Sequence, residues 1–193
     1  MAGSFAQLAK NAEKKKPLIS VSKEPVKNPP LKVYQLGDEA LRTPANRIVK
    51  VDDSIRKLAK DMLITMYSSK GIGLAAPQIG INERFFISKD FSNDSDQTII
   101  FINPEIIEAD DIVESKEGCL SIPGHYDYVK RNNRILVSYF DLSGKNEKKE
   151  FSDMQSIVFQ HELDHLDGIL FPDRLPKIRK DIFFKKIDKE FKK

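Results

Sequence analysis

The sequence predicts an α+β fold, in which a mainly antiparallel sheet packs around a central helix and a further helix ends a single domain. Runs rich in β-branched and aromatic residues follow one another without helices between them, which is typical of an antiparallel sheet. Apolar residues recur at helical spacing elsewhere in the chain. The 193 residues, of which 40% are hydrophobic and 32% charged, have the size and composition of one globular domain.

The first 30 residues show no apolar periodicity and end in Pro29 and Pro30, so we expect a flexible basic leader over residues 1–30. No apolar segment follows its lysines, which argues against a secretory signal. The leader fits either the remnant of an organellar import segment or an added expression sequence. The folded domain is then expected over residues 31–193.

The first predicted helix begins at Asp53 and ends before Gly71. Its apolar residues recur at helical spacing, and they are Ile55, Leu58, Met62, Leu63 and Met66. Short β-branched and aromatic runs between turn residues then predict strands over residues 83–88, 97–102, 105–108 and 134–141. A turn from Leu142 to Lys145 leads into a strand over residues 147–151, which predicts an antiparallel hairpin.

A second helix is expected from Ser152 to about Asp167, and Gly168 ends it. Gln155 stands three residues after Ser152, which is the spacing of a capping box. A third helix follows Pro176, over about residues 177–192. Its predicted apolar stripe lies between lysines and consists of Ile178, Ile182, Ile187 and Phe191.

Positive charge is concentrated at the two ends of the chain, with a net charge of +4 in the first 30 residues and +5 in residues 173–193. Because the whole chain is at +3, residues 31–172 carry a net charge of −6. The single cysteine, Cys119, cannot form an internal disulfide, which favours a reducing interior. No run approaches the roughly 18 apolar residues of a membrane span. Neither a membrane nor DNA is expected as a partner.

Within the second helix, His161 and His165 are one helical turn apart on the same face, so both imidazoles can bind one metal ion. Glu162 projects about 100° further round the helix, where a carboxylate can take a proton from water that the metal activates. Catalytic metal sites usually have three protein ligands, and no histidine follows His165. Cys119 is the remaining soft donor, although a lone cysteine is also commonly a small buried apolar residue.

Three segments together resemble the motifs of the peptide deformylase family and occur in the order found there: Gly71-Ile-Gly-Leu-Ala-Ala-Pro-Gln-Ile-Gly80, Glu117-Gly-Cys-Leu-Ser-Ile-Pro123 and Gln160-His-Glu-Leu-Asp-His165. The similarity covers about residues 32–175. It implies a deformylase-like fold around the metal-binding helix, with residues 31–193 as the catalytic domain. It further implies a metal-dependent amidohydrolase that removes the formyl group from the N-terminal formyl-methionine of nascent polypeptides and releases formate.

Carried over by position, the resemblance implies one metal-binding set, which is Cys119, His161 and His165. It makes Glu162 the general acid and base, and it makes Gln78 and the backbone N–H of Leu120 the donors to the developing oxyanion. The donor chemistry agrees with these roles. A thiolate and two neutral imidazoles leave a divalent ion a net charge of +1, enough to acidify a bound water towards neutral pH.

Three residues are expected to contact the substrate. Gly73 is the family position whose backbone lies against the peptide, which would bind as an added strand. Ile72 and Val158 are expected to line the methionine pocket, unless they only pack the core. His125 matches no motif position and is expected to be a surface histidine. Tyr126 lies where many bacterial relatives carry a basic residue, so we expect a different substrate affinity there.

The resemblance implies Fe²⁺ as the native metal, with Zn²⁺, Ni²⁺ or Co²⁺ as possible substitutes. A cysteine and two histidines bind zinc more tightly than ferrous iron, so purification can exchange the metal. Bacterial relatives dock on the ribosome by a basic C-terminal helix, and the third helix is similar, although its lysines could simply be solvated. Lysine outnumbers arginine 24 to 8, and with the leader this favours a plastid-type organelle over the bacterial cytoplasm or a mitochondrion.

Two alternatives belong to other functional classes. A zinc peptidase would share the helix motif, but it usually recruits a further Glu or His downstream, and no histidine follows His165. A ribosome- or RNA-binding module with a structural metal would need a fourth protein ligand, and only His125 is left to supply an imidazole.

Overall fold

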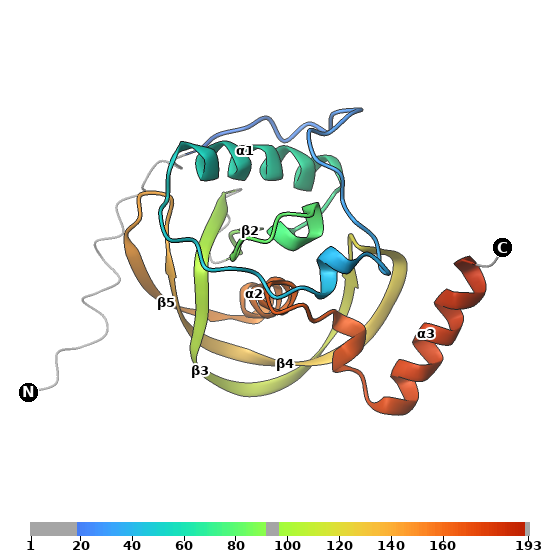
Figure 1. Ribbon diagram of the computed structural model, residues 1–193. Coiled ribbons are helices and arrows are strands. Elements are labelled where there is room, and N and C mark those ends of the chain that lie inside the picture. Colours follow the sequence, from blue (N-terminus) through green and yellow to red (C-terminus); the bar gives the residue numbers. More distant parts are fainter. Residues whose placement is uncertain (1–18, 92–96, 192–193) are drawn as a thin grey trace, which may run out of the picture.

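The computed structural model describes residues 19–91 and 97–191, with the side chains of the last two helical residues left out (Figure 1). Within these ranges the chain forms one antiparallel sheet of five strands in sequence order, β1-β2-β3-β4-β5. The bounds are β1 Gly73–Ala75, β2 Phe85–Lys89, β3 Thr98–Cys119, β4 Ile122–Phe140 and β5 Asn146–Ser152. Three α-helices accompany them, α1 Asp53–Ser68, α2 Asp153–Leu166 and α3 Lys177–Phe191. The predicted α+β class with an antiparallel sheet is confirmed.

Short 3₁₀ helices connect these elements, and they are η2 Glu39–Arg42, η3 Ala76–Ile79 and η4 Phe171–Arg174. None of the helices in the described ranges has the length and apolar character needed to cross a membrane.

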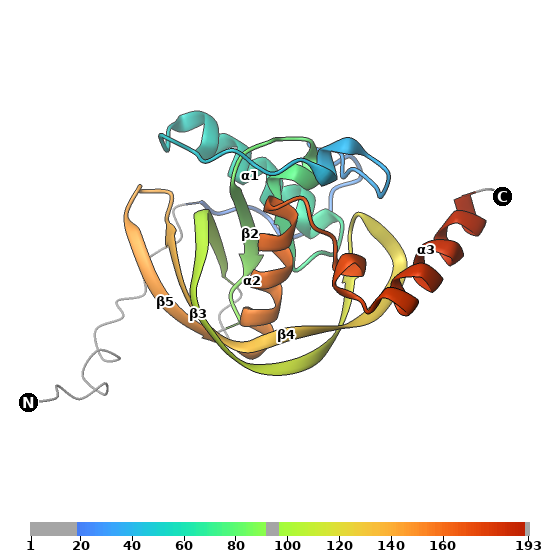
Figure 2. The ribbon, with the colours of Figure 1, turned by 60° about the horizontal axis from the view of Figure 1, so that its bottom comes forward.

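The hairpin of β3 and β4 is much longer than the sequence predicted. The separate runs over residues 97–102 and 105–108 belong to one strand of 22 residues, and β4 begins at Ile122 rather than near residue 134. Register shifts between Ile102 and Glu105 and between Ile106 and Glu108 interrupt the pairing. Such bulges increase the twist and bend a strand. The hairpin therefore curves around α2, as Figure 2 shows.

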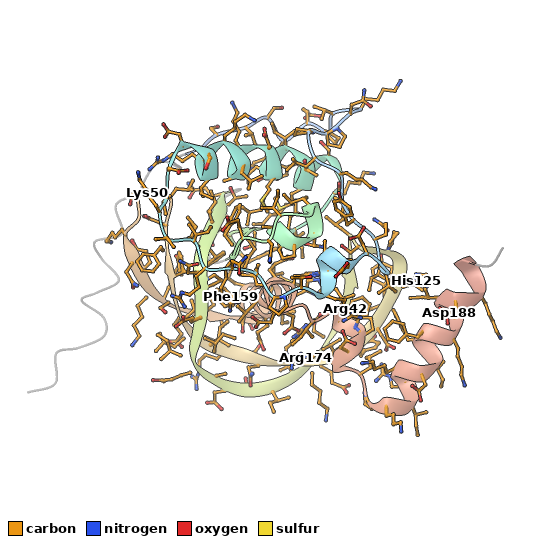
Figure 3. The ribbon with its side chains drawn as sticks, in the orientation of Figure 1. Arg42, Lys50, His125, Phe159, Arg174 and Asp188 are labelled. Atoms are coloured by element: carbon orange, nitrogen blue, oxygen red, sulfur yellow. The ribbon has the colours of Figure 1, made fainter. Side chains whose placement is uncertain are left out.

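Helix α2 lies inside this curve and carries the centre of the core. Phe159 is fully buried, and its ring centroid lies 5.2 Å from that of Phe86 on β2 and 5.1 Å from that of Phe101 on β3 (Figure 3). Edge-to-face aromatic contacts of this kind fix the rotation of the helix against the sheet. The histidine face of α2 is thereby turned towards the end of the β3–β4 hairpin.

The predicted bounds of α2 are confirmed, but its predicted capping box is wrong. The Ser152 side chain makes no cap hydrogen bond. Gln155 instead donates from Nε2 to Ser88 Oγ at 3.1 Å and accepts from the Phe91 backbone N–H at 2.8 Å. A buried amide is better satisfied by these two partners on β2 and just beyond it. At the other end Gly168, with φ of 71°, adopts the left-handed conformation expected after a helix.

Helix α1 is confirmed, and its apolar residues are in the core. The Asp52 carboxylate accepts from the backbone N–H groups of Ser54 and Ile55, and Met62, Leu63 and Met66 are fully buried. Ile19 and Val21, from the segment that precedes α1, pack against the same core cluster. The Val26 N–H also donates to Ser68 Oγ. The division into a leader over residues 1–30 and a domain over residues 31–193 stays a prediction, and residues 1–18 lie outside the described residues.

The predicted apolar stripe of α3 is wrong in half of its members. Ile187 is buried, but Ile178 and Ile182 are 75% and 62% exposed. Phe183 takes their place against the body of the fold, where its ring contacts that of Phe171. The helix turns its aromatic side inward because the core there offers aromatic partners. The side chain of Phe191 lies outside the described residues.

Candidate metal centre

The three predicted metal ligands come together on two elements. His161 and His165 project from the same face of α2, and Cys119 ends β3. The Cys119 Sγ atom lies 3.2 Å from His165 Nε2, and one ligand atom from each of the three residues lies within 4.8 Å of the others. These separations suit three donors that share one ion, since zinc or iron bonds to nitrogen and sulfur are about 2.0 to 2.3 Å long.

Cys119 reaches this position because β3 and β4 close around it. A register shift between Gly118 and Cys119 breaks the ladder, and Cys119 then pairs with Ile122 across the hairpin end. The Ser121 backbone N–H points at the sulfur, with N and Sγ 3.4 Å apart. A donor of this kind stabilises a thiolate. The motif predicted the ligand, but the strand that delivers it was missed.

Glu162 is buried beside the backbone of β1. A Cβ atom on Gly73 would lie 2.3 Å from Glu162 Oε1, so only glycine leaves room for this carboxylate. Its Oε2 atom has no hydrogen-bond partner among the residues that the structure describes. Burial raises the pKa of Glu162 to about 7, although the charge of His161 opposes the shift. A carboxyl group with such a pKa can both accept and return a proton near neutral pH.

Gln78 is held by the 3₁₀ helix η3. Its Oε1 atom accepts from the Ala75 backbone N–H at 2.8 Å, which turns the amide nitrogen towards the metal centre. The Nε2 atom lies 3.4 Å from Cys119 Sγ and 3.2 Å from Ser121 Oγ. The side chain is 2% exposed, so its donor direction is fixed. A fixed amide donor next to the metal ligands can stabilise a developing oxyanion.

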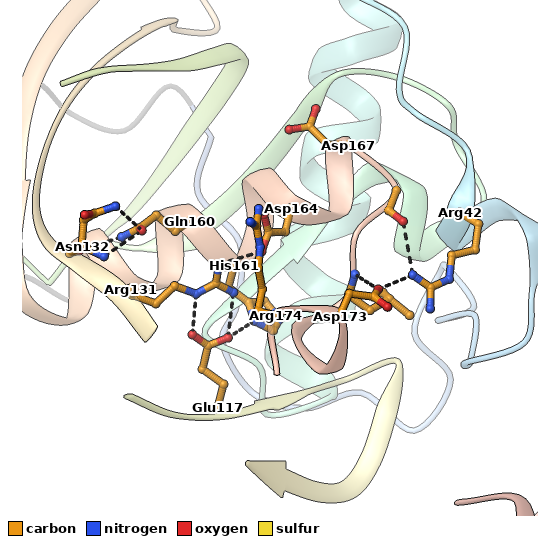
Figure 4. Close-up of polar contacts among 12 residues, drawn as sticks. Arg42, Glu117, Arg131, Asn132, Gln160, His161, Asp164, Asp167, Asp173 and Arg174 are labelled. Atoms are coloured by element: carbon orange, nitrogen blue, oxygen red, sulfur yellow. Dashed lines mark hydrogen bonds and ion pairs between the residues drawn. The ribbon is translucent and has the colours of Figure 1, made fainter. Parts of the chain in front are cut away.

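A buried ionic network supports the ligands, and sequence reasoning missed it (Figure 4). Glu117 Oε2 accepts from His161 Nδ1 at 2.9 Å, and both of its oxygens bind Arg131. Arg131 also donates to Asp164 at 2.6 Å, and Arg174 of η4 donates to the same carboxylate. Hydrogen bonds of this kind orient a metal-binding imidazole and set its tautomer.

The charges around the two histidines fit a cation. Burial alone would raise the pKa of Glu117, but hydrogen bonds from His161 and Arg131 lower it to about 2. Burial would lower the pKa of His161, yet hydrogen bonds to Cys119 and Glu117 raise it well above its ordinary value. The same negative surroundings that hold a proton on His161 would hold a metal ion in its place. Burial lowers the pKa of His165, and this keeps it in the neutral form that a ligand needs.

A pocket of about 520 Å³ opens next to the ligands. Val158, Ile72 and Leu120 are among its apolar lining, together with Ile157 and Met154 from α2. Gly73, Gln78 and Glu162 line it as well, so every residue predicted for the site except His165 faces the same cavity. Ile72 is 41% exposed and Val158 is buried, which places Ile72 at the mouth and Val158 in the wall.

Two residues of the hairpin tip had different expectations, since His125 was expected at the surface and Tyr126 where it affects substrate affinity. The His125 ring packs against Phe183 of α3 at 5.8 Å, and the cluster of possible metal ligands does not include it. Tyr126 is 63% exposed and lines the outer part of the pocket. The structure thus separates His125 from the metal centre and brings Tyr126 to its entrance.

Comparisons with known proteins agree with this arrangement. A family model described as polypeptide deformylase matches residues 30–181. A peptide deformylase of Prochlorococcus marinus (strain NATL1A) is 64% identical over 177 residues, which are 91% of this chain and 88% of that protein. A crystal structure of a peptide deformylase from Synechococcus elongatus in complex with actinonin is similar with a TM-score of 0.81 and 40% identity, over 88% of this chain and 94% of that one. A peptide deformylase structure from Thermus thermophilus gives a TM-score of 0.77 and 42% identity, over 82% and 93% of the two chains.

Proposed function

The chain belongs to the polypeptide deformylase family of metal-dependent hydrolases, and on that basis we propose which of its residues carry out the removal of formate from N-terminal formyl-methionine. The metal is held by Cys119, His161 and His165. The observation that carries this proposal is the convergence of these donors, from β3 and α2, beside the buried carboxylate of Glu162. The donor set fits a divalent ion, since its one anionic and two neutral ligands leave the ion positively charged.

When bound, the metal polarises water and the formyl oxygen. Glu162 accepts the proton of the attacking water and returns it to the departing amine, for which its pKa of about 7 is suited. Gln78 donates from Nε2 to the oxygen that gains negative charge, because its other amide atom is already bound to Ala75. The backbone N–H of Leu120 is the second proposed donor.

The substrate is proposed to enter along β1. Among the strands of the described ranges, β1 pairs only with β2, so its other edge can accept an added strand. Main-chain pairing at Gly73 would tolerate many sequences, while the methionine side chain would lie in the cavity between Ile72 and Val158. This combination suits an enzyme that acts on nascent chains of differing sequence.

Iron is proposed as the native metal, with zinc, nickel or cobalt as substitutes. Thiolate and imidazole donors such as these are suitable for all four ions, and the usual affinity order favours zinc over ferrous iron. A thiolate beside iron is also open to oxidation, which would release the metal during aerobic purification.

The activity is tested on protein purified without oxygen. We expect one metal ion per chain, mostly iron, and release of formate from a formyl-methionyl peptide at the same rate as appearance of its free amine. A zinc peptidase would instead yield internal fragments, and a module with a structural metal would yield neither product. Metal analysis and a formate assay on the same sample therefore separate the three functions.

Docking of α3 on the ribosome is proposed as a second property. Lys185, Lys186 and Lys189 are exposed on a helix that projects from the body of the fold, next to the exposed Ile182 (Figure 1). Ribosomal RNA would attract such charge, and each phosphate contact releases counterions.

Reversing these three lysines to glutamate is expected to abolish co-sedimentation with ribosomes while deformylation of a free peptide continues unchanged. Wild-type binding should fall steeply between about 50 and 200 mM salt. A matched control reverses the exposed Lys50, Lys60 and Lys148, which changes the net charge equally but away from α3. Equal co-sedimentation of the α3 variant and wild type at low salt would contradict ribosome docking.

The enzyme is proposed to act inside the cell, where formylated chains are made. The relatives named above include cyanobacterial proteins, which supports a bacterial or plastid-type setting. The choice among a plastid-type organelle, the bacterial cytoplasm and a mitochondrion stays a prediction.

A further inference from the structure

Among the described residues that line the substrate pocket, the exposed charges are all positive. Among the residues that line the cavity, the two carboxylates are Glu117 and Glu162, and both are buried and engaged at the metal centre. The exposed charged residues of the lining are Lys70, which follows α1, and Lys116, which lies in β3. Neither is required by the hydrolysis itself.

The backbone of Lys70 is fixed at the end of α1. Its φ of 56° is the left-handed conformation that follows a helix, and its N–H donates to Tyr67 O at 3.0 Å. The next N–H, of Gly71, donates to Met66 O at 2.9 Å. Lys70 stands only three residues before Gly73, so its side chain starts from a rigid point beside the open edge of β1.

Lys116 lies on a different element of the pocket lining, near the end of β3. Its Nζ atom lies 5.7 Å from the centroid of the Tyr126 ring, within cation–π range. The ring in turn lies over Gly118, where a Cβ atom would be 2.4 Å from it. Lys116 and Tyr126 thus form an ordered part of the pocket rim. In the described part of the chain, neither Lys116 nor Lys70 has a carboxylate partner.

We propose that Lys70 and Lys116 give this enzyme a preference for substrates with an acidic side chain within the first few residues after the formyl-methionine. The inference rests on the proposed function, in which the methionine occupies the inner pocket and the chain continues along β1. A strand advances about 3.3 Å per residue, so a peptide that leaves Gly73 in the direction of Ile72 passes Lys70 within about three residues. Two ammonium groups with no carboxylate partner among the described residues attract a carboxylate there and repel a lysine.

The test compares formyl-Met-Ala-Ala-Ala peptides in which glutamate, glutamine or lysine replaces the residue at position two, three or four. At low salt we expect kcat/KM for glutamate to exceed that for glutamine by about three- to tenfold at one or more of these positions, mainly through KM, because exposed charge pairs are worth little more. The lysine peptide should be the poorest of the three. Raising the salt should reduce the differences.

Variants then assign the preference to the two lysines. The double substitution Lys70→Gln with Lys116→Gln should remove the glutamate preference and keep the rate on the glutamine peptide, and Lys70→Glu with Lys116→Glu should favour the lysine peptide. Lys60→Gln with Lys148→Gln, at exposed positions away from the pocket lining, is the matched control and should behave as wild type. Equal rates for glutamate and glutamine peptides in wild type, or an unchanged preference in the double variant, would overturn the proposal. Failure to release formate from any peptide would count against the proposed function instead.

Discussion

Replacing Glu162 by glutamine is expected to leave the metal bound and to lower kcat by at least about 10²- to 10⁴-fold, the usual contribution of a general acid or base. The amide has nearly the same shape and fits the space beside Gly73, but it cannot accept a proton. No proposed metal ligand is changed, because the cluster that could hold the ion consists of Cys119, His161 and His165. The measurement is formate release per bound metal ion.

The control for this variant is Asp167→Asn, which removes a carboxylate at the end of the same helix. Asp167 pairs with Arg84 at the surface and does not line the pocket. Its loss should change kcat by less than about twofold, since exposed ion pairs contribute little. If Glu162→Gln kept more than about a tenth of the wild-type rate at full metal content, another group would have to move the proton.

The residues of the site were easier to predict than the strands that carry them. His161, Glu162 and His165 lie within one helical turn, so spacing alone placed both histidines on one face. Cys119 and Gln78 were assigned through family motifs, and the structure brings them within 3.4 Å of each other. Local spacing would not have shown this contact, because 41 residues separate the two.

The hairpin between β3 and β4 could not be read from periodicity. Residues 107–116 are all exposed or half-exposed and rich in charge, which resembles a loop more than a strand. Their order comes from pairing with β4, and pairing partners are not visible in a single sequence. The predicted apolar stripe of α3 was wrong for a related reason. Whether Ile182 or Phe183 faces the core depends on the aromatic surface that the helix meets.

Buried charges were the other feature that the sequence concealed. Glu117, Arg131 and Asp164 look like ordinary surface residues, yet each is at most 6% exposed. The signal available for Glu117 was its position two residues before Cys119. From such a position a side chain can contact a second metal ligand. The buried ion pair of Arg131 and Asp164 could be recognised only from the folded structure, because the two side chains meet where β4 crosses α2.

Replacing Cys119 by serine is expected to weaken metal binding by more than about 100-fold, beyond the usual effect of losing a group that only supports a ligand. A hydroxyl is harder than a thiolate and keeps its proton at neutral pH, so the ion would lose its one anionic ligand. Affinity is measured by competition with a chelator under anaerobic conditions. Formate release should fall in proportion to the metal lost and recover partly when metal is added in excess.

The variant Cys119→Asp separates the charge of the ligand from its softness. A carboxylate restores the negative charge beside His165, so we expect Cys119→Asp to hold the metal more tightly than Cys119→Ser but less tightly than wild type. Thermal unfolding of the metal-free proteins checks the fold, because Cys119 is only partly buried and its loss should change stability little without metal. Undiminished metal content in Cys119→Ser would mean that the third ligand lies elsewhere in the chain.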